Sequence, residues 1–496
     1  PAADQWAFFP SGSVGYRFSE EEYFKPVKSW WSNGKIRASY GEIGNEAVGS
    51  NMFLSTVSAI ANTSASGYSY WLNGNQLLSM YNMPTLVSPT LTWERIVTAD
   101  VGIDLGFFNN SLNVGFDWYQ RDTKDMLGPA QELPGVLGTK APYGNNGSLR
   151  TRGWELNVNW NHSFGDWDVY ASAAISDATT KITKWNDASG LIYTYDPTKG
   201  NYYEGQTFGD IWGFETERYF EVSDFNADGT LKAGIPSQAA LETGKFTYGP
   251  GDIKFRDLNN DGKIDNGDGT IKNPGDLKVI GTALPRYEYS FRVGGAWKGF
   301  DLDVFFQGVG KRNLWTTGSM VIPFAQNGAN VGLFDHQLDY NYQDINISYN
   351  ASDLTQPAVW TAQGTYHVDQ NAMYPTLYTS SDMAESSTIP NIGRGGYNFY
   401  PQDRYLVNMA YLRLKNITFG YTLPYEITRH ALIQAARIYF SADNLCFLYN
   451  GAGKYKIDPE ISQGYTGVGG QNTANAGWGR TVPMMRTYSF GIQVTF

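Results

Sequence analysis

The chain has 496 residues and a formal net charge of −11, and 15% of its residues are aromatic. Its acidity argues against nucleic acid as a partner, and its single cysteine, Cys446, excludes a disulfide framework or a cysteine-based metal site. No apolar run approaches the roughly 18 residues of a membrane helix, so no helix of this chain is expected to cross a bilayer.

The aromatic residues suggest another membrane architecture. The chain contains 34 Tyr, 27 Phe and 15 Trp, together with 55 Gly. Membrane β-barrels use aromatic side chains as girdles at both interfaces, and their lipid-facing residues alternate with polar ones. The composition therefore keeps a membrane β-barrel open as an interpretation.

The first predicted strand pair joins Val14–Phe18 to the stretch from Lys35 to Ile43. The first of these segments alternates large apolar with other residues, as Val14, Tyr16 and Phe18 show. Side chains of a strand point alternately to its two faces, so this spacing predicts one apolar face.

The clearest hairpin lies between Ala99 and Trp118. Its apolar residues, Ala99, Val101, Ile103, Leu105 and Phe107 and then Leu112, Val114, Phe116 and Trp118, alternate with polar residues or glycine. A turn at Asn109-Asn110 pairs Phe107 with Leu112 and places every apolar residue on one face. A slip of one residue would place the two sets on opposite faces, so the register itself supports an antiparallel hairpin.

Two later segments satisfy the same requirement. In one, Trp154, Leu156, Val158 and Trp160 face Trp167, Val169 and Ala171 across an even-length linker, Asn161–Asp166. In the other, Tyr287, Tyr289, Phe291, Val293 and Trp297 turn at Lys298-Gly299 into Phe300, Leu302, Val304 and Phe306. Three independent agreements in register predict antiparallel hairpins.

The last predicted strands close the chain. Ile417, Phe419, Tyr421 and Leu423 are expected to pair with Ile438, Phe440 and Ala442. The final segment alternates Tyr488, Phe490, Ile492, Val494 and Phe496 with smaller residues. A last strand ending on phenylalanine is typical of outer-membrane barrels, although an edge strand of a soluble sheet would have the same pattern.

Short turns alternate with long polar connections, about 44–98, 121–148, 177–286, 315–410 and 448–485. Outer-membrane barrels have this asymmetry, with the long loops outside the cell. The pattern predicts about eleven strands, and because an antiparallel barrel closes with an even number, we expect the chain to supply only part of a barrel.

One acidic segment has the spacing of a calcium loop. Asp257, Asn259, Asp261, Lys263, Asp265 and Asp268 fall on positions 1, 3, 5, 7, 9 and 12 of an EF-hand-type loop, with Gly262 at position 6. These oxygen ligands, with the main-chain carbonyl of Lys263, predict structural Ca²⁺ in an extracellular loop. The alternative is an Asp/Asn/Gly turn without an ion. A second run, Asp224–Gly229, begins alike but has Ile235 at position 12.

Residues suited to catalysis are not grouped in this sequence. The four histidines, His162, His336, His367 and His430, lack ligand spacing, and no phosphate-binding loop or nucleophile elbow is present. We therefore expect no enzymatic activity.

Several segments, spread over the chain and in family order, resemble the SusC/RagA family of TonB-dependent outer-membrane transporters. They are Phe9–Ser11, Ser19–Glu21, Lys35–Asn45, Leu91–Glu94, Val101–Gly106, Asp257–Gly262, Tyr411–Pro424, Asp443–Leu445 and Arg486–Gly491. The resemblance implies a barrel of about 22 strands with a plug domain inside it. It also implies a TonB-contacting segment and a SusD-like surface lipoprotein as lid.

The resulting prediction is an all-β chain, in which residues 1–496 form the C-terminal part of a large transmembrane barrel with long extracellular loops. The plug domain and TonB box would belong to the remaining N-terminal part. The expected function is TonB-dependent import of a bulky nutrient, glycan or peptide fragments, across the outer membrane of a Gram-negative bacterium. A passive porin and a cell-surface adhesin or glycan-binding β-protein remain alternatives.

Overall fold

The computed structural model describes residues 6–45, 55, 57, 59–61, 71–72, 75–76, 79–81, 86–88, 91–129, 136, 142–185, 202–242, 247–316, 321–323, 334–343, 346–348, 359–361, 365–377, 397–460, 471–472 and 484–496. The chain divides into two compact units. Unit 1 comprises Pro1–Asn157, Asp177–Ser189 and Tyr202–Phe208, and unit 2 comprises Val158–Ser176, Gly190–Asn201 and Gly209–Phe496.

Eleven long strands carry the fold. They are β1 (Ser11–Tyr16), β2 (Trp31–Asn45), β7 (Glu94–Phe107), β8 (Leu112–Pro129), β9 (Tyr143–Phe164), β10 (Trp167–Trp185), β15 (Arg286–Trp297), β16 (Phe300–Lys311), β23 (Tyr411–Thr422), β24 (Ala435–Asn450) and β26 (Thr487–Thr495). They are hydrogen-bonded in exactly this sequence order, and β1 and β26 are its end strands. The described sheet is therefore open, and the predicted number of strands is confirmed.

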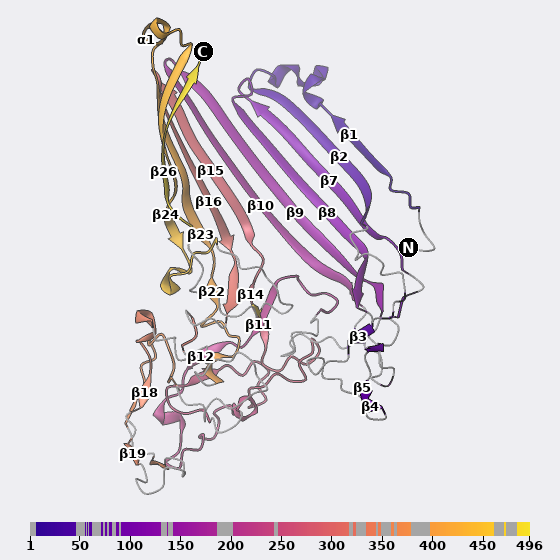
Figure 1. Ribbon diagram of the computed structural model, residues 1–496, viewed down its shortest axis with the longest axis vertical. Coiled ribbons are helices and arrows are strands. Elements are labelled where there is room, and N and C mark those ends of the chain that lie inside the picture. Colours follow the sequence, from indigo (N-terminus) through magenta and orange to yellow (C-terminus); the bar gives the residue numbers. More distant parts are fainter. Residues whose placement is uncertain are drawn as a thin grey trace. The chain divides into compact units, whose positions relative to one another are not determined.

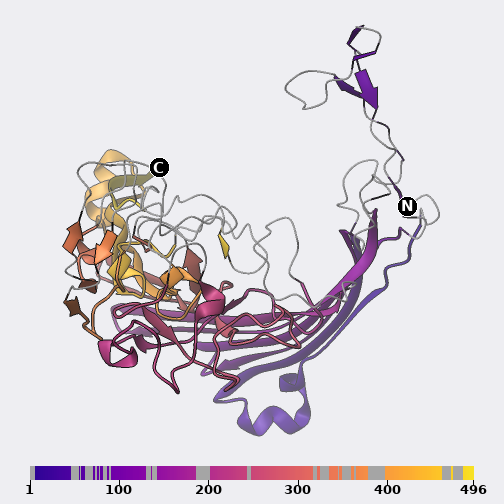
Figure 2. The same ribbon diagram turned by 90° about the horizontal axis from the view of Figure 1, so that it is seen from below.

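In unit 1 the predicted register is confirmed. Phe107 pairs with Leu112, Leu105 with Val114 and Ile103 with Phe116. On the other side of β7, Ile36 and Ala38 of β2 pair with Ile103 and Val101, so their side chains lie on the same apolar face. The pairing of β1 with β2 extends this face by one more strand. Figure 2 shows these strands, indigo to violet, running side by side.

In unit 2 the register is confirmed as well. Trp297 pairs with Phe300, and Val293 pairs with Val304 on one side and Ala171 on the other. The predicted pairing of β23 with β24 is confirmed too, because Phe440 of β24 pairs with Phe419. On its other side, Phe440 pairs with Phe490 of β26. One alternation of side chains thus continues across β10, β15, β16, β23, β24 and β26.

Several predicted boundaries were wrong. The stretch Asn161–Asp166 is not a six-residue linker, because β9 continues to Phe164 and leaves only Gly165-Asp166 as the turn. Phe18 lies in a 3-10 turn, η1 (Phe18–Glu20), rather than in a strand. Strands β7, β8 and β10 also run several residues into segments predicted as loops. Alternation weakens at strand ends, where both faces become polar, so the pattern underestimates strand length.

Among the residues that the structure describes, helices are few and short. They are the 3-10 turns η1, η2 (Glu22–Val27), η5 (Val222–Asp224), η6 (Ala239–Leu241), η7 (Asp335–Gln337), η9 (Tyr397–Phe399), η10 (Arg429–Ala431) and η11 (Gly453–Tyr455), and one α-helix, α1 (Tyr425–Thr428). Within the described part of the chain, no helix is long and apolar enough to cross a membrane.

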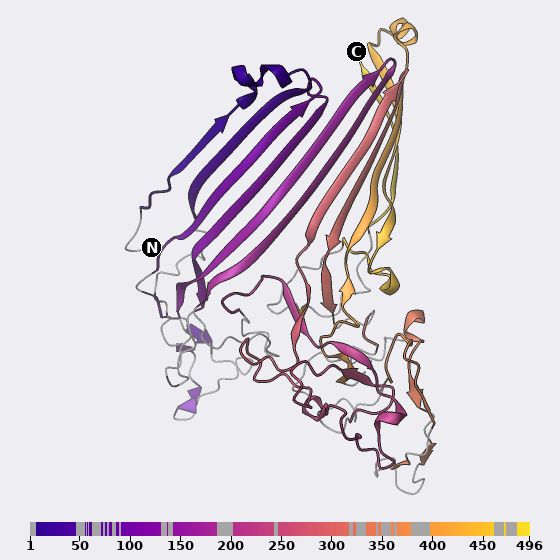
Figure 3. The same ribbon diagram turned by 180° about the vertical axis from the view of Figure 1, so that it is seen from behind.

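The connections contain short paired strands. In unit 2 these are β11 (Asp210–Gly213) with β14 (Lys278–Thr282), β12 (Thr216–Tyr219) with β13 (Ile253–Phe255), β18 (Tyr342–Gln343) with β21 (Tyr366–His367), β19 (Asn346–Ser348) with β20 (Val359–Thr361), and β17 (Asn313–Thr316) with β22 (Val407–Asn408) and β25 (Gln471–Asn472). Unit 1 adds β3 (Ala59–Ala61) with β6 (Ser79–Tyr81) and β4 (Trp71–Leu72) with β5 (Asn75–Gln76). Figures 1 and 3 show β11, β12, β14 and β18 beyond one end of the long strands of unit 2, with α1 at the other end.

Candidate transport wall and loop surface

The polar face of unit 1 carries a charged cluster centred on Arg37. The Arg37 guanidinium contacts Asp117 at 2.6 Å and Asp104 at 3.2 Å, and it lies 3.6 Å from Asp100. These residues come from three adjacent strands, β2, β7 and β8, on the face opposite Val101. One arginine among three carboxylates leaves a net negative, hydrated surface, which suits contact with water rather than lipid.

Unit 2 has a similar polar face. Arg437 of β24 donates from Nε to Asp301 of β16 at 2.9 Å. Next to it, Asp303 accepts a hydrogen bond from the Tyr170 hydroxyl and lies 3.4 Å from Nε of Arg292. Charged groups of β15, β16 and β24 and the Tyr170 hydroxyl of β10 therefore face one side, and they satisfy one another across strand boundaries.

The opposite face of unit 2 is apolar and ends in a row of aromatic side chains. Trp167 pairs with Trp297, Trp297 with Phe300, and Phe300 with Tyr421 along adjacent strands. The two indoles stack with centroids 5.1 Å apart, and the Phe300 and Tyr421 rings are 4.4 Å apart. Aromatic rows of this kind mark the level of the membrane–water interface in barrels. Val293, on the same face, is 52% exposed.

The deepest packing lies in the connections rather than in the long strands. The described segments 209–242, 247–283, 334–343, 365–377, 397–410 and 451–460 form what we call the loop body. Tyr219, Phe255, Tyr374, Phe399 and Tyr405 are each at most 1% exposed there. The Tyr374 and Tyr405 rings stack with centroids 5.4 Å apart, and burial raises the pKa of both phenols. Sequence reasoning treated these segments as polar loops and missed this core.

Hydrogen bonds tie the segments of the loop body together. The Tyr219 hydroxyl donates to the Ala372 carbonyl at 2.9 Å, and the Asn398 side chain both donates to Asp252 and accepts from the Ile253 amide, each at 2.8 Å. The Gly251 carbonyl accepts from the Thr376 amide at 3.0 Å. Residues more than a hundred positions apart thus share one core, so the loops fold jointly.

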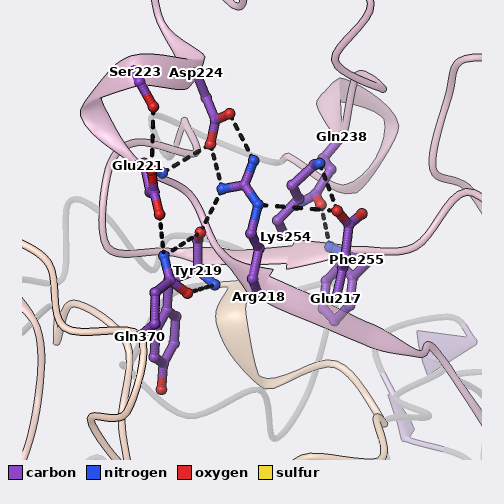
Figure 4. Close-up of polar contacts among 10 residues, drawn as sticks. All are labelled: Glu217, Arg218, Tyr219, Glu221, Ser223, Asp224, Gln238, Lys254, Phe255 and Gln370. Atoms are coloured by element: carbon purple, nitrogen blue, oxygen red, sulfur yellow. Dashed lines mark hydrogen bonds and ion pairs between the residues drawn. The ribbon is translucent and has the colours of Figure 1, made fainter.

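Figure 4 shows the polar cluster at the centre of this contact. Arg218 binds both oxygens of Asp224, at 2.6 and 2.7 Å, and this pairing holds the pKa of Asp224 below its usual value. Lys254, only 6% exposed, pairs with Glu217 at 3.0 Å. The Gln370 side chain accepts a hydrogen bond from the Tyr219 amide at 2.9 Å and donates one to the Tyr219 carbonyl at 3.1 Å. It thereby bonds to both backbone groups of Tyr219, as a residue of a neighbouring strand would.

The predicted calcium ligands lie along one mostly exposed stretch of the loop body, where each side chain bonds to nearby backbone amides. Asp257 accepts hydrogen bonds from the amides of Asn260 and Gly262, at 2.6 and 2.9 Å. The other side chains each bind a nearby amide, as Asn259 binds Asp261 N, Asp261 binds Lys263 N, Asp265 binds Gly267 N and Asp268 binds Thr270 N. Among the residues described, no group of three or more His, Cys, Asp or Glu is close enough to hold a metal.

A carboxylate that the sequence did not single out supports this turn. Asp276 is fully buried and accepts from the amides of Leu258 at 2.7 Å and Asp265 at 2.9 Å. Burial raises its pKa, and the charge of Asp257 adds to the effect. Asp276 lies eleven positions after Asp265, outside any EF-hand spacing, so no local pattern could identify it. In the second acidic run, the Asp224 carboxylate forms an ion pair with Arg218.

The chain matches the family described as TonB dependent receptor-like, beta-barrel, over residues 1–247. It is 26% identical to TonB-dependent receptor P3 of Formosa agariphila over 99% of this chain and 42% of that protein. It is 24% identical to TonB-dependent receptor SusC of Bacteroides thetaiotaomicron over 93% of this chain and 38% of that protein. The chain thus spans about two fifths of the length of these curated relatives.

Solved structures agree on the fold. The RagAB peptide importer in the open-open state matches with a TM-score of 0.64 and 21% identity, over 99% of this chain and 43% of that chain. A further structure of the RagAB peptide transporter gives a TM-score of 0.62 and 20% identity, over 99% of this chain and 44% of that one. The chain therefore belongs to the TonB-dependent receptor β-barrel family, whose members lie in the outer membrane of Gram-negative bacteria.

Proposed function

We propose that the chain forms part of the wall and outer loop surface of a TonB-dependent importer for a bulky nutrient, glycan or peptide fragments. The observation that carries this proposal is the division of each long strand into two faces. One face is apolar and ends in the aromatic row of Trp167, Trp297, Phe300 and Tyr421, and the other carries ion-paired charges. A wall between lipid and a water-filled lumen needs both faces.

The chain itself has no catalytic task in this proposal. Energy would come from TonB acting on a plug in the remaining part of the transporter, and the free edges of β1 and β26 would pair with strands of that part. The charged clusters would line the water-filled lumen through which the substrate passes. The curated relatives that match are named receptors rather than enzymes, which supports this division of roles.

Uptake by cells tests the mechanism. Cells that carry the full-length transporter should accumulate a labelled substrate only when TonB is present, and a strain without TonB should lose uptake. Uptake that continues without TonB would favour a passive porin. Surface binding with no uptake in either strain would favour an adhesin or glycan-binding protein. The substrate itself can be identified by mass spectrometry of material that copurifies with the intact complex, which separates glycans from peptides.

We also propose that a SusD-like lipoprotein rests on the loop body as a lid. The support is that this surface is preorganised, because its segments share a buried core instead of hanging as separate loops. Exposed apolar side chains on it, Leu338 at 63% and Tyr342 at 47%, are available for contact. The L338D and Y342D substitutions in the full-length protein should reduce copurification of the lipoprotein in mild detergent, and V222D, at an exposed valine elsewhere on the loop body, is the matched control. Equal recovery with all variants would contradict a lid at this place.

Calcium is the third part of the proposal. Each carboxylate oxygen that accepts an amide hydrogen keeps a second lone pair, so the turn from Asp257 to Asp268 could also bind a hard cation. The ion would fix the long connection outside the cell, with the Lys263 carbonyl and the oxygens of Asp257, Asn259, Asp261, Asp265 and Asp268 as ligands. It would have no part in the energetics of transport.

A further inference from the structure

The connection between β23 and β24 differs from the other turns at the same end of unit 2. The neighbouring turns have two residues each, Gly165-Asp166 and Lys298-Gly299. Between β23 and β24, by contrast, the twelve residues 423–434 form α1 and the 3-10 turn η10. Figure 1 shows α1 projecting past the ends of the strands.

This connection exposes large apolar side chains. Tyr425 is 62% exposed, Ile427 59% and Leu432 88%, and we call these three residues the apolar knob. Hydrogen bonds hold the knob in shape, because the Ile433 amide donates to the Thr428 carbonyl at 3.2 Å and the Leu432 amide to the Arg429 carbonyl at 3.1 Å. An ordered turn that displays three apolar groups is unusual on a surface that meets only water.

Leu432 is also held in an unfavourable backbone conformation. Its φ is +59° and its ψ is +29°, in the left-handed region that glycine or asparagine normally occupies at a helix end. In water, therefore, Leu432 has both an unfavourable backbone and an exposed apolar side chain. Contact of this side chain with an apolar phase would offset both costs, whereas glycine would serve the turn better in water.

The position of the knob indicates which phase that is. Tyr421, four residues before Tyr425, belongs to the aromatic row at the membrane interface and contacts Phe300. Four residues span about 14 Å at most, so Tyr425 stays within reach of the lipid headgroups. Arg429, beside the knob, is exposed and has no ion pair within the described part of the chain, so it is free to meet a phosphate.

We infer that the apolar knob inserts into the headgroup region of the inner leaflet of the outer membrane, with Arg429 facing phospholipid phosphates. Interfacial turns with an apolar side and a cationic side bind bilayers in this way. The knob would extend the membrane contact of β23 and β24 beyond the aromatic row, and so fix the depth of this wall in the bilayer.

Nitroxide labelling of the full-length transporter in vesicles of phosphatidylethanolamine and phosphatidylglycerol tests this inference. Single cysteines replace Ile427 and Leu432 in a background without Cys446 or any other native cysteine. A third label at Asp166, an exposed residue in a two-residue turn at the same end, is the control. Collision of each nitroxide with oxygen and with a water-soluble nickel chelate reports its depth.

The inference expects an oxygen-to-nickel collision ratio several-fold higher at 427 and 432 than at 166. Equal ratios at all three sites would place the knob in water and overturn it. Protection of 427 and 432 from both probes would also overturn it, because that result means a protein surface covers the knob. L432G gives a check on folding, since it should refold as well as the parent in detergent while removing the most exposed side chain of the knob.

Discussion

The ring of Tyr170 covers the α-carbon of Gly294 on the adjacent strand, and a β-carbon on Gly294 would stand 2.4 Å from the ring carbon that bears the hydroxyl. The Leu302 carbonyl oxygen would be 2.6 Å away on the other side. Gly102 is similarly crowded by Asp117 and Arg37. Any side chain at these glycines must displace a neighbour, so they cannot serve as neutral positions on the polar face.

Orientation of the sheet in the membrane is tested by V293R. Val293 lies on the apolar face, so an arginine there should lower the free energy of unfolding by roughly 2–4 kcal/mol near the bilayer midplane. The matched control is S290R, because Ser290 lies on the polar face of the same strand, where charge remains hydrated. Urea titration of vesicle-reconstituted protein measures both, and an equal loss at the two positions would reverse the assignment of faces.

The packing of glycine under an aromatic ring is tested on β24 and β26. The three atoms nearest to a β-carbon on Gly491 would all belong to the Tyr439 side chain, at 2.4–2.6 Å, so G491A should destabilise by about 1–3 kcal/mol. Truncation of the ring in Y439A should remove the clash. A double-mutant cycle therefore expects G491A to cost much less in the Y439A background. Additive losses in urea titrations would mean that Gly491 is needed for another reason.

Sequence reasoning succeeded where period-two alternation was strict. The Ala99–Trp118 hairpin was placed to the residue, because a slip of one would have turned Ile103 and Leu105 to the polar face. The pattern failed in the loop body, where Tyr219, Tyr374 and Tyr405 meet from segments up to 186 positions apart. No local period encodes such contacts, since the three residues lie in segments that are far apart in the sequence.

The candidate calcium site, too, could be predicted from the sequence only in part. The spacing from Asp257 to Asp268 identified the acidic turn, since those residues are close in sequence. Asp276, which holds the turn through the amides of Leu258 and Asp265, became visible only in the fold. The Arg218–Asp224 pair likewise had no sequence signal that distinguished it from solvated charges.

Joint folding of the loop segments is tested by Q370A. The Gln370 side chain binds both the amide and the carbonyl of Tyr219, and its loss leaves two backbone groups without these partners, at a cost of about 1–3 kcal/mol. Limited proteolysis should then cut faster within 209–283, a segment that ends 87 residues before the substitution. Q434A, at an exposed glutamine in the β23–β24 connection, should leave cleavage unchanged. Faster cleavage confined to 365–377 would contradict a shared core.

The Arg218–Asp224 pair predicts a pH dependence. Arg218 holds the pKa of Asp224 below its unfolded value, so the pair stabilises the loop body fully above the unfolded pKa of about 4. That contribution is lost as pH falls through the lower, folded pKa. D224N should remove about 1–3 kcal/mol at neutral pH and flatten the acid limb of stability below about pH 4. Hydrogen exchange of residues 216–225 measures this, and an unchanged acid limb in D224N would assign the dependence to other carboxylates.

Calcium binding is tested by protease protection of the segment from Phe255 to Ile271 in the full-length protein. Asp261 also binds the Lys263 amide at 2.9 Å, so D261A should loosen the turn even without calcium. Only the calcium-dependent part of protection is therefore informative.

In the parent, protection should rise with added calcium, with a midpoint of about 0.1–1 mM for a weak extracellular site, and a chelator should reverse it. In D261A this rise should vanish, whereas D228A, in the acidic run that lacks a position-12 ligand, should keep it. Protection of the parent that is identical with calcium and with chelator would mean that amide hydrogen bonds alone shape this turn.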